Sequence, residues 1–170
     1  MKIVLIVLSA LVLLTAATVA IGAMLPKAHI ASRSASLRAS PEQLFALISG
    51  PQNWRPDVKN WESIPDAAGR RLARETTRDG ESITYEILDA SFPISIKRRV
   101  ATENLPYSGT WSYSLQSDGE ITTVRITENG EVYNPVFRFL SRFVIGYTHT
   151  IDAYLRALGQ VTGQEVQIRD

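Results

Sequence analysis

The feature that most limits what this chain can fold into is an uncharged run of 23 residues, Ile3 to Leu25, which reads IVLIVLSALVLLTAATVAIGAML. As an α-helix this run would be about 35 Å long, enough to cross a hydrocarbon core of roughly 30 Å. Pro26 and Lys27 end it. We therefore predict that residues 1–26 form a transmembrane signal-anchor, so that the chain is a single-pass membrane protein.

Two other interpretations of the run remain open. In the first it is a cleaved signal peptide, with Lys2 as the basic start and small residues such as Ala20 and Gly22 near the cleavage site. In the second it is a helix buried in a soluble core. Signal peptides usually have an apolar stretch of about 7 to 15 residues, so the greater length favours an uncleaved anchor. Basic residues flank the run on both sides, so the positive-inside rule does not decide its orientation. The Met-Lys start favours an extracytoplasmic domain.

The remaining residues suit one domain of ordinary size. The sequence has no cysteine, which excludes disulfides and thiolate metal sites. Of its 18 basic residues only Lys2 precedes the run's end, so 17 basic residues face 17 acidic ones in the rest of the chain. A nucleic-acid-binding protein usually carries a basic surplus, so we expect no nucleic-acid partner.

The middle of the chain has the patterning of an antiparallel sheet. After a tether at 27–31, a first strand is expected at 33–38, a helix capped by Ser40 follows it, and a second short helix is expected within 53–61. Apolar residues then alternate along about six strands. Hairpin-type dipeptides separate these strands, namely Asp79-Gly80, Asp118-Gly119 and Asn129-Gly130.

The end of the chain has the patterning of one long helix. Asn134 can cap it and Pro135 suits its first turn. A stripe of apolar residues then recurs at steps of three and four over about six turns, formed by Val136, Leu140, Phe143, Tyr147, Ile151, Tyr154 and Leu158. Such a stripe and the inner face of a sheet can bury each other. The predicted fold is α+β, with a curved antiparallel sheet wrapped around a long C-terminal helix. The domain would span 32–160, with a tail at 161–170.

The segment from Ala39 to Ile48 (ASPEQLFALI), followed by Trp54-Arg55-Pro56-Asp57, resembles the opening of START-like domains of the polyketide cyclase/dehydrase and lipid-transport superfamily. Phe45 stands where that family often has Trp, and Ser49-Gly50 stands where an Asp is common. The resemblance covers about 32–158. It implies a helix-grip fold with a cavity for an apolar ligand between sheet and helix, and it says little about function because the fold hosts many chemistries.

Six residues are candidates for the wall of such a cavity. Arg98 falls in phase with Ile96 on one strand, and Glu128 falls in phase with Ile126 on another. Buried charges of this kind either anchor a ligand or pair with each other, unless they lie at the rim. Aromatic residues with polar tips complete the set, and each also suits ordinary core packing. The aromatic candidates are Tyr85, Trp111, Tyr113 and Tyr147.

Catalytic motifs are missing from the sequence. It has no nucleophile elbow, no phosphate-binding loop and no dinucleotide fingerprint. Its two histidines, His29 and His149, lack ligand spacing, so we expect no metal and no cofactor. The favoured hypothesis is a membrane-anchored module that binds or carries a hydrophobic small molecule or lipid. A polyketide cyclase/dehydrase-type enzyme is the alternative, and an interaction domain without a ligand is a third. The sequence names no protein partner.

Overall fold

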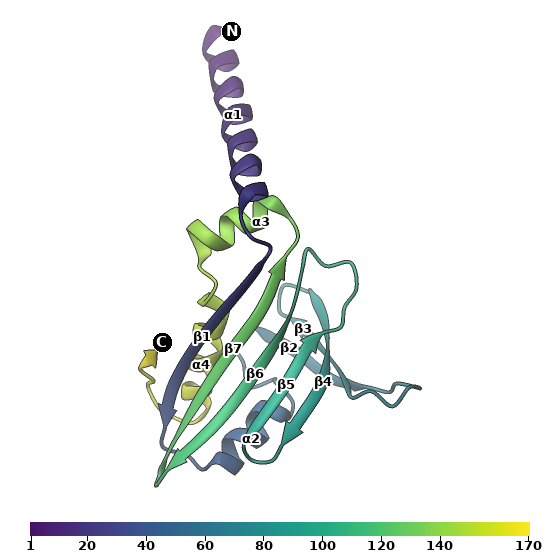
Figure 1. Cartoon of the computed structure of the whole chain (residues 1–170), viewed down its shortest axis with the longest axis vertical. Coiled ribbons are helices and arrows are strands. Elements are labelled where there is room, and N and C mark those ends of the chain that lie inside the picture. The colour runs from purple at the N-terminus through teal and green to yellow at the C-terminus, as the bar shows by residue number, and fades with distance from the viewer.

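The computed structural model describes residues 1–170 and shows a long helix standing on an α+β domain (Figure 1). Helix α1 (Lys2–Met24) leads away from the domain and exposes its apolar side chains on all sides. It is long and apolar enough to cross a membrane, with a mean hydropathy of 2.8. A membrane span and a signal sequence can share this length and composition.

The domain is built on one antiparallel sheet of eight strands in the order β2-β3-β4-β5-β6-β7-β1-β8. Consecutive strands from β2 to β7 form a meander, which confirms the six strands expected after the first helix. The strands are β1 (Ala28–Leu37), β2 (Val58–Ile64), β3 (Leu72–Thr77), β4 (Ser82–Ser91), β5 (Ser95–Val100), β6 (Tyr107–Asp118), β7 (Ile121–Val132) and β8 (Ile168–Arg169).

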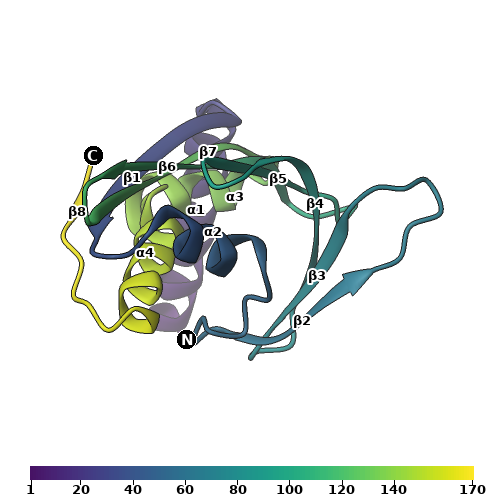
Figure 2. The same ribbon diagram turned by 90° about the horizontal axis from the view of Figure 1, so that it is seen from below.

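The concave face of this sheet holds the helices α2 (Pro41–Ser49) and α4 (His149–Val161) (Figure 2). Ser40 caps α2 as expected, because its hydroxyl accepts a hydrogen bond from the Gln43 amide. Helix α4 presents a buried stripe at i, i+3, i+4 and i+7. This stripe, Ile151, Tyr154, Leu155 and Leu158, packs with the inner faces of β5, β6, β7 and β1 in the main core. The predicted helix-grip fold is therefore confirmed.

The prediction of one continuous terminal helix is wrong. The chain forms α3 (Pro135–Leu140), then a π-helical turn, η1 (Ser141–Ile145), and breaks at Gly146 before α4 begins. Gly146 has φ +84°, a left-handed conformation that ends a helix and that side-chain-bearing residues rarely adopt. Only α4 enters the core. Segment α3–η1 lies instead at the base of α1 (Figure 1).

Three smaller expectations also need correction. Strand β1 begins at Ala28, so most of the predicted tether at 27–31 is strand. The second short helix is not formed, because 53–57 is a turn and Trp61 lies in β2. Asn129-Gly130 lies inside β7 and is not a turn, since both neighbouring strands pair with it there. Within the segment named as the tail, Ile168 and Arg169 form β8, which pairs with β1.

Candidate functional site

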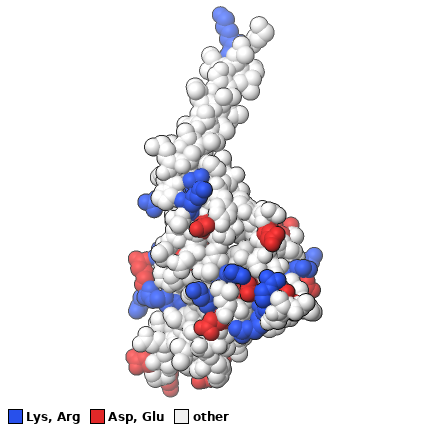
Figure 3. Space-filling model, turned by 45° about the vertical axis from the view of Figure 1, so that its right-hand side comes forward, with Lys and Arg blue, Asp and Glu red and all other residues white.

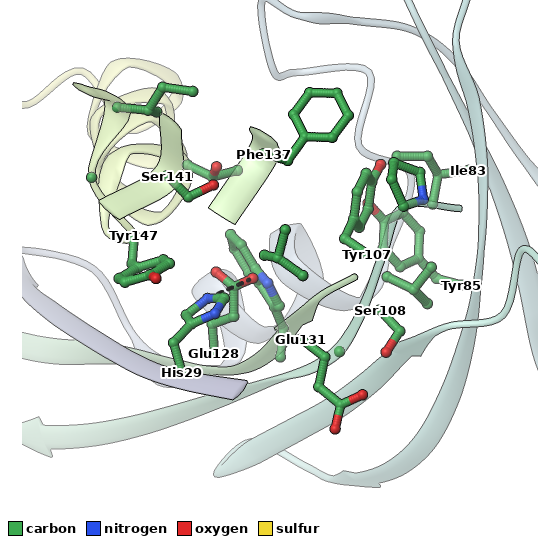
Figure 4. A pocket seen from close by; sticks show the side chains of 18 residues that line it. His29, Ile83, Tyr85, Tyr107, Ser108, Glu128, Glu131, Phe137, Ser141 and Tyr147 are labelled. Carbon is green, nitrogen blue, oxygen red and sulfur yellow. Dashed lines mark ion pairs between the residues drawn. The ribbon is translucent and has the colours of Figure 1, made fainter. Parts of the chain in front are cut away.

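A cavity of about 350 Å³ lies between the sheet and the segment around the helix break (Figure 4). Half of its 18 lining residues are hydrophobic. Strands β4, β5, β6, β7 and β1 supply one wall, and α3, η1 and the turn after them supply the other. The cavity exists because α3–η1 does not continue along the axis of α4. No helix therefore packs directly on this part of the sheet.

Four of the six predicted residues line this cavity, namely Tyr85, Trp111, Glu128 and Tyr147. Trp111 and Glu128 lie directly opposite each other in the β6–β7 ladder, so they share the concave face. Tyr85 reaches the cavity from β4, and Tyr147 reaches it from the turn after Gly146. Burial raises the pKa of Tyr85 to about 12, which keeps its phenol neutral.

The other two, Arg98 and Tyr113, do not line the cavity but lie deeper in the domain. Arg98 is 5% exposed, and four aromatic rings surround its guanidinium. The centroids of Tyr85 and Tyr113 are both 4.9 Å from it, and those of Tyr154 and Trp111 are 5.7 and 5.9 Å away. These cation–π contacts offset part of the cost of burying the charge.

The alternative in which Arg98 pairs with Glu128 is not what the structure shows. In the sheet Arg98 is opposite Trp111, and Trp111 is opposite Glu128, so the indole lies between the two charges. Arg98 Nε and the Tyr113 hydroxyl are buried without a hydrogen-bond partner. Position on the correct strand face was therefore not enough to place either side chain at the cavity.

A buried polar network separates Arg98 from the loop that carries the Trp54–Asp57 motif. Arg55 Nη1 donates to Glu75 Oε2 at 2.9 Å, and the Arg55 guanidinium lies 5.3 Å from the Tyr154 ring centroid. The Tyr154 hydroxyl in turn donates to Gln52 Oε1 at 2.9 Å. These contacts fix the loop against α4, so the motif residue Arg55 has a structural part here and does not reach the cavity.

His29 is a cavity residue that the sequence did not predict, and it lies beside Glu128. Its ring stacks on Tyr147 with centroids 4.1 Å apart, and its Nε2 lies 3.8 Å from Glu128 Oε1. Gly130, which is opposite His29 in the β1–β7 ladder, makes room for the ring, because a Cβ there would lie 2.4 Å from His29 Cε1. The missed signal is the glycine itself, which suggested a turn residue.

Burial shifts the pKa of both members of this pair toward the neutral form. It raises the pKa of the Glu128 carboxyl, against the opposing effect of the Trp111 indole N–H. It lowers the pKa of the His29 imidazole. Near pH 7 the imidazole is therefore uncharged, and its 3.8 Å contact with Glu128 is not a full ion pair. The pair gives the cavity one polar corner that holds two titratable side chains.

Metal ligands do not gather anywhere in the domain. No group of three or more His, Cys, Asp or Glu side chains is placed to hold an ion.

The family model for polyketide cyclase/dehydrase and lipid transport matches residues 28–161, which takes in the whole sheet meander and α4. No curated protein matches the sequence.

Solved structures with the same fold are numerous. The chain is similar to a START superfamily protein from Mycobacterium smegmatis, with a TM-score of 0.61 and 18% identity over 79% of this chain and 98% of that one. A conserved protein from Geobacillus kaustophilus gives 0.66 and 16% identity over 84% and 100%. Truncated norcoclaurine synthase from Thalictrum flavum gives 0.61 and 12% over 79% and 93%. At these identities the likeness is one of fold.

Proposed function

Because the chain belongs to the polyketide cyclase/dehydrase and lipid transport family, we propose that its domain binds a hydrophobic small molecule or lipid while α1 anchors it in a membrane. The observation that carries the proposal is the cavity of about 350 Å³ with its largely aromatic and aliphatic wall. Close-packed interiors leave few voids larger than a water molecule, so a space of this size is available to a ligand.

The wall favours a ligand with an apolar body and one polar end. Ile83, Val100 and Phe137 offer apolar contacts. At one corner the Glu128 carboxylate offers a hydrogen-bond acceptor and the neutral His29 imidazole offers an N–H donor. A neutral polar end such as a hydroxyl or carbonyl suits this corner better than a second carboxylate. A ligand carboxylate beside Glu128 would add like charge in a poorly solvated site.

Contacts between α1 and the domain favour retention of the anchor over cleavage. Arg138 is 6% exposed and its Nη1 donates to the carbonyl of Leu25 at 2.7 Å and to that of Ala23 at 3.4 Å. Gly22 is buried against Pro135, where an added Cβ would lie 1.9 Å from the Pro135 carbonyl oxygen. Cleavage near Ala23 would remove the Gly22–Pro135 contact and would leave the Leu25 carbonyl, the nearer acceptor of Arg138, on a free N-terminal end.

A space-filling substitution tests the binding proposal. The full chain in lipid nanodiscs should show saturable energy transfer from tryptophan to a dansyl-labelled long-chain alcohol, above the signal of empty nanodiscs. Ser141→Phe adds a ring to the cavity wall and should weaken that binding at least tenfold. Ser114→Phe, on the outer face of β6, should leave it unchanged. Equal affinities for the two variants, or no saturable signal in the parent chain, would leave only the interaction-domain hypothesis.

An enzyme of the cyclase/dehydrase type is the second candidate, and the Glu128–His29 corner is the observation that favours it. A carboxylate with a raised pKa is a stronger base and can take a proton from a carbon next to a carbonyl. A long-chain methyl ketone bound in D₂O would then exchange its α-hydrogens, with the proton passing to Glu128 and on to solvent. The exchange should depend on the protein and vanish in Glu128→Gln. A parent chain that binds the ketone without exchange is a carrier.

A further inference from the structure

The outer side of α3–η1 is an apolar surface with no partner inside the chain. Phe143, Val144 and Ile145 are 59%, 68% and 53% exposed, and Val136 and Phe137 are also exposed. The segment has no acidic residue, and its two charged residues are Arg138 and Arg142. Contiguous exposed apolar surface of this kind marks a contact with another protein, a membrane or a ligand.

The position of this surface, at the end of the apolar run of α1, indicates that the partner is a membrane. The Arg138 hydrogen bonds to Ala23 and Leu25 hold α3 at the point where the apolar run of α1 ends. The Gly22–Pro135 contact fixes the same end of α1 against α3. In Figure 3 basic side chains lie at the base of α1, below a shaft of uncharged surface. Basic and aromatic residues at the end of a span are typical of the headgroup level of a bilayer.

The inner side of the same segment forms part of the cavity wall. Phe137, Ser141 and Ile145 all line the cavity, and Phe137 and Ile145 also belong to the exposed set. One short segment therefore lines the cavity and also carries the exposed apolar surface. The break at Gly146 gives it a direction of its own, separate from α4.

We propose that α3–η1 lies in the surface of the same bilayer that α1 spans, with Phe143 and Val144 among the lipids. This sets the α3–η1 wall of the cavity against the membrane, so that a lipid or other bilayer-dissolved ligand passes between membrane and cavity without crossing water. The transfer step rests on the ligand-binding function proposed above. The membrane contact of α3–η1 does not.

Single-cysteine labelling of the full chain tests the membrane contact cleanly, because the sequence has no cysteine of its own. An environment-sensitive fluorophore at Val144→Cys, in vesicles of phosphatidylcholine and phosphatidylglycerol, should emit at shorter wavelength than one at Ser117→Cys, an exposed position at the β6–β7 hairpin. Lipids that carry a nitroxide on the acyl chain should quench the Val144 site several-fold more strongly. Equal emission and quenching at the two sites would overturn the proposal. A blue shift at Val144 without lipid quenching would also overturn it, because it would mean that protein covers the surface.

A second variant separates the membrane contact from ligand binding. Val144→Glu places a charge at the bilayer surface and should slow uptake of the bilayer-dissolved dansyl alcohol several-fold, with equilibrium binding little changed. Ser117→Glu is its control. Normal quenching at Val144→Cys with no saturable alcohol binding would refute the ligand-binding function and leave the docking surface standing. Saturable alcohol binding with no quenching at Val144→Cys would refute the membrane contact of α3–η1 and leave the ligand-binding function standing. An uptake rate unchanged by Val144→Glu would refute direct transfer.

Discussion

Glycine at position 130 lets an imidazole share the cavity wall with Glu128. The three strands that meet there bring His29, Gly130 and Gly109 side by side. Any Cβ at 130 would overlap the ring of His29 at 2.4 Å and approach Glu128 Oε1 at 3.1 Å. The side chain of His29, rather than the backbone, is what must yield to such a change.

Gly130→Ala should therefore alter the cavity more than the fold. We expect His29 to leave its stack on Tyr147, with probe affinity falling several-fold and the free energy of unfolding falling by less than about 1.5 kcal/mol. The double variant His29→Ala with Gly130→Ala should regain stability relative to the sum of the two single changes, which a double-mutant cycle measures. Strict additivity would show that the two residues do not compete for space.

Glu128 should make the binding of a neutral ligand dependent on pH. A ligand that fills the cavity removes water from the carboxyl group and raises its pKa further, so binding takes up a proton. Affinity should then fall as pH rises above the raised pKa of Glu128 in the free protein and through its still higher pKa in the complex. His29 acts in the opposite sense below its ordinary value of 6.5, because burial disfavours its protonated form. Tyr85 and Tyr107 stay neutral throughout this window.

The measurement is a titration of dansyl alcohol affinity from about pH 4.5 to 8. Glu128→Gln should remove the decline on the alkaline side and keep the effect of His29 on the acid side. The same direction applies to folding: the contribution of Glu128 to stability is largest below 4.5 and is lost as pH rises through its folded-state pKa. An alkaline decline that survives in Glu128→Gln would assign the titration to another group.

Alternation along strands placed three cavity residues correctly, because a period of two is a local property of the chain. Tyr85, Trp111 and Glu128 needed nothing more. Alternation does not encode depth, so Arg98 was assigned to the correct face but to the wrong surroundings. His29 was missed because its neighbours come from β7, about a hundred residues further along the chain.

At the scale of elements, the helix break at Gly146 shows how much a periodic pattern can predict. The apolar stripe continues through α3, η1 and α4, yet only α4 packs in the main core. Periodicity reports that one side of a helix is apolar, and it does not report which apolar surroundings that side meets. The single glycine with φ +84° marks the change from the core to the base of α1.

Two matched truncations distinguish the two halves of this stripe. Ile151→Ala, at a fully buried site in α4, should lower the free energy of unfolding by about 2 to 5 kcal/mol. Leu140→Ala, at a half-buried site in α3, should cost less than about 2 kcal/mol, because α3 lies outside the main core. Denaturation of the full chain in detergent gives both values. Equal losses would mean that the stripe is buried as one unit after all.

For the whole molecule, the sheet and the grip were predictable and the joint with α1 was not. Asp79-Gly80 and Asp118-Gly119 do form hairpin turns, and local turns suffice to order β3 to β4 and β6 to β7. β1 lies between β7 and β8, and both pairings join segments that are far apart in the sequence. No local pattern specifies such pairings. The same holds for the Arg138 hydrogen bonds to Ala23 and Leu25, which join residues more than a hundred positions apart.

That joint makes α1 and the domain a single unit, and Gly22→Leu should separate them. Leucine extends the apolar run and is a better helix former than glycine, so membrane insertion should not suffer. The side chain cannot coexist with the Pro135 carbonyl, so α3 must move away from α1 and Arg138 must lose its acceptors. Ala16→Leu, at an exposed position on α1, is the matched control with a similar gain in apolar surface.

Both variants should resist carbonate extraction like the parent chain, with intact mass showing that residues before Gly22 are retained. Only Gly22→Leu should speed amide hydrogen exchange in α3, because its helix then loses the support of α1. It should also weaken lipid quenching at Val144, since the outer surface would no longer be held at the membrane. Identical exchange in the two variants would show that α1 is only a tether. A mature N-terminus near Ala23 would remove the anchor, and with it the reason for the apolar surface of α3–η1 to face a bilayer.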